Sequence, residues 1–167
     1  MCPMRKGWVV AAFLFVVAFP LFLCVQEGTA APSQLELLAQ RFSDTEKDLR
    51  ETRVELWELG KALGDNNISL VVYKLEVAEV ICHFEGHLIS LYPDTKDSAR
   101  QDYVDKTVAE LSAAKKKMGE TLKGIQEIRT YIPYPPALQM MDKAKASIES
   151  SVGFMDDAIA AFHALTK

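Results

Sequence analysis

The sequence predicts an all-α protein, an antiparallel up-down-up-down four-helix bundle preceded by an N-terminal signal peptide. Apolar residues recur at steps of three and four in four long segments, which is the period of amphipathic helices. Short polar or proline-rich stretches separate these segments, and short connections make neighbouring helices antiparallel. No stretch alternates apolar and polar residues with the period of two that a strand needs. The alternative is a longer helical array in which the first and last helices share few contacts.

The first thirty residues are predicted to be a secretory signal peptide that is cleaved after export. Arg5 and Lys6 precede an unbroken apolar run over residues 8–25, and small residues follow, among them Gly28 and Ala30. This order of basic, apolar and small residues is typical of a secretory signal. We therefore expect residues 1–30 to be removed and residues 31–167 to form a single helical domain.

Two other roles for the N-terminal segment follow from the same residues. The eighteen-residue run over 8–25 is just long enough to span a bilayer, so an uncleaved membrane anchor is the main alternative. Cys24 could carry a lipid, but the bulky Leu23 before it differs from the small residues of a bacterial lipoprotein site.

The charge and cysteine content of the remaining chain exclude some functions. Of the 167 residues, 137 remain without the first thirty, with 17 basic and 22 acidic side chains, a net charge of −5. This acidity argues against a nucleic-acid partner, which requires a basic face. Cys82 is then the single cysteine, so no intrachain disulfide can form. An exported domain without disulfides favours a bacterial periplasm over other secreted locations.

The first predicted helix begins after Ser33, which is placed to cap it, with Glu36 as the capping-box partner three residues on. Its apolar residues form a heptad seam, as in a coiled coil, in which Thr45 and Thr52 take the two polar rungs. The seam consists of Leu35, Leu38, Phe42, Leu49, Leu56, Leu59 and Leu63. Gly64 is expected to end the helix, and the polar residues after it to cap the next one.

The second predicted helix, over residues 68–91, is the most apolar part of the chain outside the N-terminus. A helical wheel divides it into three arcs. We expect the main apolar stripe to comprise Val77, Ile81, Phe84, Leu88 and Leu91, and a second arc to comprise Leu75, Ala78, Cys82 and Ile89. Glu85 falls between these arcs and is predicted to face the core, whereas Glu76, Glu79, His83 and His87 are predicted to face solvent.

The third and fourth helices are predicted on either side of a proline-rich segment. Asp97 or Ser98 is expected to cap the third helix. Residues 132–136 contain three prolines and cannot continue it, because proline lacks the amide hydrogen and clashes with the preceding turn. Pro136 suits the first turn of the fourth helix.

His83 and His87 are the candidate metal ligands. They stand four residues apart, so both imidazoles project from one helix face, and Glu79 one turn earlier could add a carboxylate. Zinc accepts nitrogen and oxygen ligands of this kind, and copper or nickel accepts the imidazoles. The other interpretation is a solvated polar face. Haem is a further alternative, with Met118, Met141 or Met155 opposite a histidine, although methionines at seam positions usually fill the core.

No catalytic motif is present, so the chain is predicted not to be an enzyme and to need no cofactor. Phe84 follows His83, which rules out HExxH, and phosphate-binding glycine loops and Ca²⁺ loops are missing. Cys82 and His83 are adjacent and therefore point about 100° apart on a helix, which does not make a nucleophile–base pair.

Tyr131 and Tyr134 form a stiff aromatic tip with the nearby prolines, and Trp57 is expected at the same end. These three residues either cover the end of the core or contact a partner, because aromatic side chains anchor interfaces. The function predicted from the sequence is therefore an exported binding or interaction module of the periplasm or cell envelope. Its partner is a protein or a small molecule, and a homodimer is an open alternative. The rival function is a metal-binding bundle that uses His83 and His87.

Overall fold

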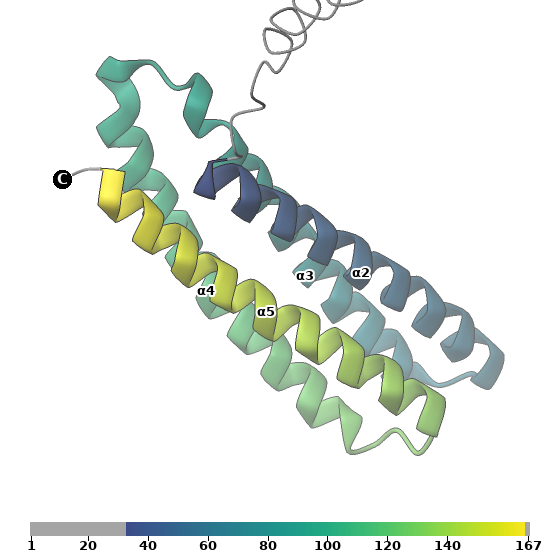
Figure 1. The fold of residues 1–167 in the computed structure, drawn as a ribbon. Helices are drawn as coiled ribbons and strands as arrows, with labels where there is room; N and C mark the ends of the chain where they lie inside the picture. Colours follow the sequence, from purple (N-terminus) through teal and green to yellow (C-terminus); the bar gives the residue numbers. More distant parts are fainter. Residues whose placement is uncertain (1–32, 166–167) are drawn as a thin grey trace, which may run out of the picture. The chain divides into compact units, whose positions relative to one another are not determined.

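The computed structural model describes residues 33–165, which are almost entirely helical and contain no strand. Four long helices lie side by side: α2 (Gln34–Leu63), α3 (Asn66–Ser90), α4 (Arg100–Arg129) and α5 (Pro135–Leu165) (Figure 1). Two short 3₁₀ turns, η1 (Tyr92–Asp94) and η2 (Asp97–Ala99), connect α3 to α4. The predicted all-α helical bundle is confirmed. Residues 1–30, predicted to be a signal peptide, lie outside the described residues.

The ends of the first two helices follow the predicted local chemistry. Ser33 and Glu36 form the reciprocal capping box of α2, and Gly64 ends that helix with a φ of 64°. This left-handed conformation suits glycine because it has no Cβ. Asp65 then caps α3 by accepting a hydrogen bond from the amide of Asn67 at 2.7 Å. The turn between α2 and α3 is therefore specified by local sequence.

The start of α4 differs from the prediction. Asp97 or Ser98 was expected to cap the helix, but both lie in η2, and α4 begins at Arg100 without a side-chain cap. Instead, Asp97 forms a 2.9 Å ion pair with Nη1 of Arg100. A carboxylate at this position still favours the helix, since it lies near the positive end of the helix dipole.

The core contains most of the predicted seam residues. In α2, Leu35, Leu38, Phe42, Leu49 and Leu56 are buried, whereas Leu59 is half-buried and Leu63 is exposed. Thr45 and Thr52 are buried in the two polar rungs as expected. Their hydroxyls donate to the carbonyls of Arg41 and Asp48, at 2.9 and 2.8 Å, so no polar atom of these rungs is left without a partner.

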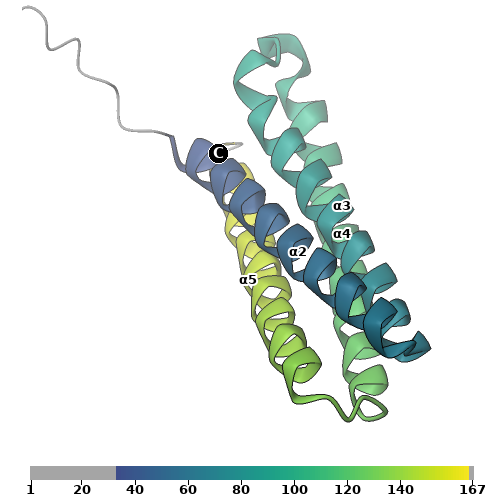
Figure 2. The ribbon, with the colours of Figure 1, turned by 90° about the vertical axis from the view of Figure 1, so that its right-hand side faces the viewer.

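Two glycines bring α2 and α3 close together, and these two helices pack more extensively against each other than any other pair. Figure 2 shows the two helices joined by a short turn at one end. A Cβ on Gly60 would lie 3.0 Å from Cγ2 of Ile68, and one on Gly86 would lie 3.0 Å from Cβ of Phe42. Because Gly60 on α2 and Gly86 on α3 have no side chain, the two helices can approach closely near both of their ends.

The core face of α3 is not the one expected. Leu75, Ala78, Cys82 and Ile89, the second arc of the wheel, are fully buried. The expected main stripe is half-buried at Val77, Ile81 and Leu88 and exposed at Phe84 and Leu91. This interpretation of the wheel was wrong because α3 has two apolar faces, and periodicity alone does not say which one meets the other helices.

Candidate functional site

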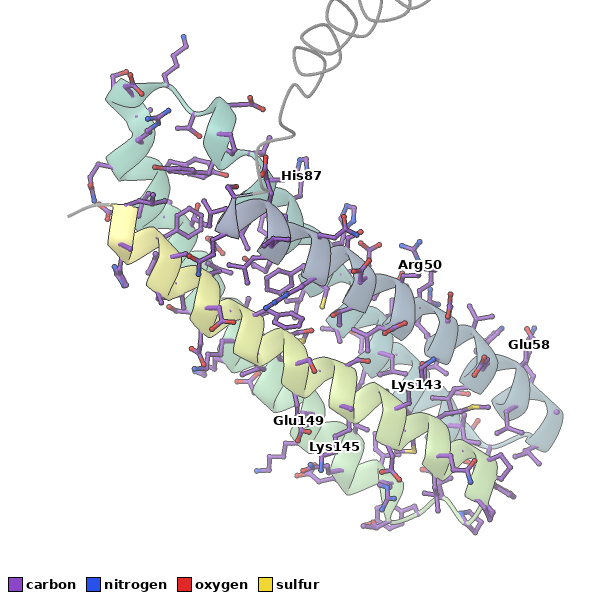
Figure 3. All side chains as sticks on the ribbon, viewed as in Figure 1. Arg50, Glu58, His87, Lys143, Lys145 and Glu149 are labelled. Carbon is purple, nitrogen blue, oxygen red and sulfur yellow. The ribbon has the colours of Figure 1, made fainter. Side chains whose placement is uncertain are left out.

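A groove of ≈ 410 Å³ between α2 and α3 contains both predicted histidines. His83 and His87 project from α3, and Leu35, Ala39 and Glu46 come from α2. His87 lies near the end of the bundle where α2 begins, whereas Glu58 lies toward the opposite end (Figure 3). Both histidines are exposed, as the wheel predicted. The structure therefore brings the histidine pair to the wall of one groove.

His83 contacts Glu46 across this groove. Its Nδ1 lies 3.1 Å from Oε2 of Glu46, while the other carboxylate oxygen of Glu46 accepts a hydrogen bond from Arg50. The side chain of Glu46 is only 13% exposed, whereas that of His83 is 70% exposed. The imidazole is thus held at one nitrogen and open to solvent over most of its surface.

Glu79 does not join the histidines. It was predicted to face solvent as a third metal ligand, but it is buried between α2 and α3. Its two carboxylate oxygens accept hydrogen bonds from Nε of Arg50 at 2.9 Å and Nε of Arg53 at 2.8 Å. Burial acts to raise the pKa of Glu79, but the hydrogen bonds from Arg53 and Arg50 outweigh it and hold the pKa below its usual range. This carboxylate belongs to an ion-pair network that joins two helices.

The predicted ligand set is therefore not assembled as one group. Within residues 33–165, no three histidine, cysteine, aspartate or glutamate side chains gather in a way that would hold a metal ion. Met118, Met141 and Met155, considered as haem ligands, are buried in the core, whereas both histidines are on the surface. Metal binding by His83 and His87 alone stays a prediction.

Cys82 is a packed core residue. Its side chain is fully buried, and its sulfur lies 3.3 Å from the hydroxyl of Ser151 on α5. That hydroxyl donates to the carbonyl of Ser147 at 2.9 Å, which leaves the thiol as the donor in the contact with Cys82. Burial raises the pKa of the thiol to about 11, so it stays protonated at neutral pH.

Glu85 is the inward-facing charge that the wheel predicted. Its side chain is 3% exposed, and its Oε2 is buried without a hydrogen-bond partner. Burial, followed by repulsion from Glu110 on α4, raises the pKa of this carboxyl to about 7. A buried acid of this kind destabilises the fold when it ionises.

The predicted aromatic tip is only partly exposed. Tyr131 is 71% exposed and Trp57 is 43% exposed, with Nζ of Lys61 5.1 Å from the Trp57 ring centroid. Tyr134 packs against the core. Tyr131 and Trp57 could therefore contact a partner, and that role stays a prediction.

The outer face of α3 carries an apolar stripe, three residues of which (Val77, Phe84 and Leu91) were predicted from the wheel to face the core. Leu70, Tyr73, Val80 and Phe84 are 53%, 64%, 61% and 50% exposed, Leu91 is 39% exposed, and Val77 between them is half-buried. These six residues, called the α3 stripe below, are spaced by three, four, three, four and seven residues. The same spacing forms the seam of a coiled coil. The pattern was visible in the sequence, but its orientation was not.

No family model matches the chain, and neither a curated protein nor a solved structure resembles it significantly.

None of the helices between residues 33 and 165 combines the length and apolar character that crossing a membrane requires.

Proposed function

We propose that this chain is an exported, non-enzymatic helical bundle that acts as a protein-interaction module in the bacterial periplasm or cell envelope. The α3 stripe is the observation that supports this proposal most. One apolar face of α3 packs against the other helices, whereas its second apolar face meets water. Contiguous apolar surface of this kind marks interaction sites in soluble proteins.

The fold behind this proposal is an antiparallel up-down-up-down bundle. The contacts between α2 and α3 support an antiparallel arrangement. As the residue number rises along α2, the number of the residue that it contacts on α3 falls. Phe42 lies next to Gly86, Glu46 next to His83, and Gly60 next to Ile68. The ion pairs of α4 with α5 follow the same order: Lys115 with Asp156, and Arg129 with Asp142.

Export depends on the N-terminal segment. Residues 1–30 are proposed to be a cleaved signal peptide, and an anchor over residues 8–25 is the alternative. Either would bring the bundle into the cell envelope. Mass spectrometry of the protein isolated from its host separates the two, since cleavage after Ala30 removes the first thirty residues.

A photo-crosslinking experiment tests the interaction function. A photoreactive amino acid replaces Phe84 in the stripe or, as the matched control, Val54 on α2, which is 49% exposed. The proposal expects a discrete protein adduct from position 84 in irradiated cells and none from position 54. Equal crosslinking at both positions, or none at either, would contradict it.

A metal-binding function is the second candidate, because His83 and His87 share the wall of one groove. Two imidazoles four residues apart on a helix can chelate zinc, copper or nickel. Protein purified without a histidine tag should then contain the metal and melt at a higher temperature on adding zinc or copper, and His87→Ala should abolish the shift. A metal-free protein without a shift would exclude this function.

A further inference from the structure

The α3 stripe is large enough to be the apolar centre of a dimer interface. An aromatic side chain presents roughly 150–250 Å², so the exposed parts of Tyr73 and Phe84 alone amount to about 200 Å². Leu70, Val80 and Leu91 extend this area along a helix that is about 37 Å long at about 1.5 Å per residue. A standard interface needs about 800 Å² from each partner, with an apolar centre and a polar rim.

The central part of the stripe, from Tyr73 to Phe84, is complementary to itself when two copies of α3 run antiparallel. In the heptad pattern, Leu70, Val77 and Phe84 occupy one seam position and Tyr73 and Val80 the other. Antiparallel seams pair one position with the other. Val77 then meets Val80 of a second copy, and Tyr73 meets Phe84. The twofold axis repeats each pair, so two ring-on-ring contacts flank a centre of four valines.

The polar residues beside the stripe match in the same register. Glu76 and His83 lie seven residues apart on one edge, and the twofold axis sets Glu76 of each copy opposite His83 of the other. His83 donates its Nδ1 proton to Glu46, so its Nε2 donates to the second copy's Glu76 carboxylate only in the imidazolium form, which carries a proton on both nitrogens. Ser69 and Ser90 meet on the same edge. The edge thus offers complementary charge and hydrogen-bonding groups rather than like charges.

We propose that the partner docked on the α3 stripe is a second copy of this chain, bound antiparallel through α3. This inference rests on the proposed interaction function and names its partner. The dimer has one isologous interface, in which α3 of each copy covers the exposed apolar face of the other.

Sedimentation equilibrium of the purified chain tests the dimer. The wild-type protein should show a concentration-dependent monomer–dimer equilibrium. Phe84→Glu should raise the dissociation constant about 100-fold, because each of the two copies then brings a charged carboxylate into the apolar centre of the interface. Val54→Glu, an equally exposed position on α2, should leave the constant unchanged. Circular dichroism should show the same helical content for all three proteins.

Two charge variants test the register. Glu76→Lys should weaken the dimer, because it faces His83 of the second copy with a positive charge. His83→Lys should keep or tighten it, because the new ammonium group faces both Glu46 and the second copy's Glu76. Equal effects of the two variants would overturn the antiparallel register.

A chain that stays monomeric at about 100 μM overturns the second-copy proposal. The crosslinks from position 84 separate this failure from failure of the proposed function. An adduct to a different protein with a monomeric purified chain would leave the interaction function standing and remove the second copy as the partner. Absence of any adduct would remove both.

Discussion

Glu79 on α3 accepts one hydrogen bond from Arg50 and another from Arg53 on α2, at 2.9 and 2.8 Å. The two arginines are 29 and 26 positions away along the chain, so the carboxylate ties together the two helices that form the candidate groove. The network extends further because Arg50 also donates a hydrogen bond to Glu46, and Glu46 in turn contacts Nδ1 of His83. The exposed imidazole is therefore positioned by an ion-pair network that begins at Glu79.

Glu79→Gln should lower the free energy of unfolding by about 1–3 kcal/mol at pH 7, because a charge-assisted pair inside the α2–α3 contact is lost. The folded-state pKa of Glu79 lies below its unfolded value. Its stabilisation is therefore present above the unfolded pKa and lost as pH falls through the folded pKa. Urea unfolding of wild type and variant should give a difference that shrinks in acid.

Glu58→Gln is the matched control for Glu79→Gln. Glu58 pairs with Lys61 at 3.7 Å on the surface of α2, and both side chains are exposed. Surface pairs of this kind contribute about 0–1 kcal/mol. An equal loss of stability in the two variants would show that Glu79 has no special role.

Glu85→Gln should stabilise the protein at pH 8. The pKa of this carboxyl is raised to about 7 in the folded chain, from an ordinary value of 4.5. Between these values the native state holds a proton that the unfolded state has lost, so stability falls as pH rises and stays low above pH 7. This difference between the folded and unfolded pKa values corresponds to a loss of unfolding free energy on the order of 3 kcal/mol at pH 8.

Urea unfolding between pH 4 and pH 8 measures this effect. The wild type should lose stability across that range relative to Glu85→Gln, and the variant should match it most closely near pH 4. Glu149→Gln, which removes an exposed carboxylate of α5, should follow the wild type. A Glu85→Gln variant that is less stable than wild type at pH 8 would contradict the buried, unpartnered carboxylate.

Gly86→Ala should destabilise the bundle by about 1 kcal/mol. Alanine gains about 1 kcal/mol of helix propensity over glycine, but overpacking a close contact costs about 1–3 kcal/mol. The added Cβ would lie 3.0 Å from Cβ of Phe42 and 3.5 Å from the carbonyl oxygen of Ala39, and neither can move without shifting α2. Thermal unfolding followed by circular dichroism measures the change.

Gly153→Ala tests the same argument with the opposite sign. A Cβ at this position of α5 meets nothing within 4 Å, so only the gain in helix propensity remains. We expect stabilisation of up to about 1 kcal/mol. If both alanine variants changed stability in the same direction, close packing would not explain why position 86 is a glycine.

The sequence predicted those parts of the fold that depend on neighbouring residues. Ser33 with Glu36, Gly64 and Asp65 define the ends of α2 and the start of α3 through contacts a few positions apart. Glu79 could not be placed in this way, because its partners are two arginines on another helix. A wheel shows that Glu79 and His83 share a side of α3, but it does not show what lies opposite.

The orientation of α3 could not be predicted for a related reason. Phe84 and Cys82 belong to the two different apolar arcs of the wheel, and hydrophobic spacing does not decide which arc faces the core. What turns Cys82 inward is the packing of the whole bundle, including its contact with Ser151 on α5 and the close approach at Gly86. Part of the candidate interaction surface, Val77, Phe84 and Leu91, was therefore recognised as an apolar stripe in the sequence but was predicted to face the core.

Thiol labelling tests the outward orientation of the α3 stripe most directly. In a Val80→Cys variant at low micromolar concentration, native-state alkylation at pH 8 should rapidly modify the thiol introduced at position 80 and leave Cys82 unmodified, as located by peptide mapping. Raising the protein concentration should slow the modification at position 80 as a second copy covers it, and urea should expose both thiols. Protection of the introduced thiol equal to that of Cys82 at every dilution would place the stripe in the core and contradict the account.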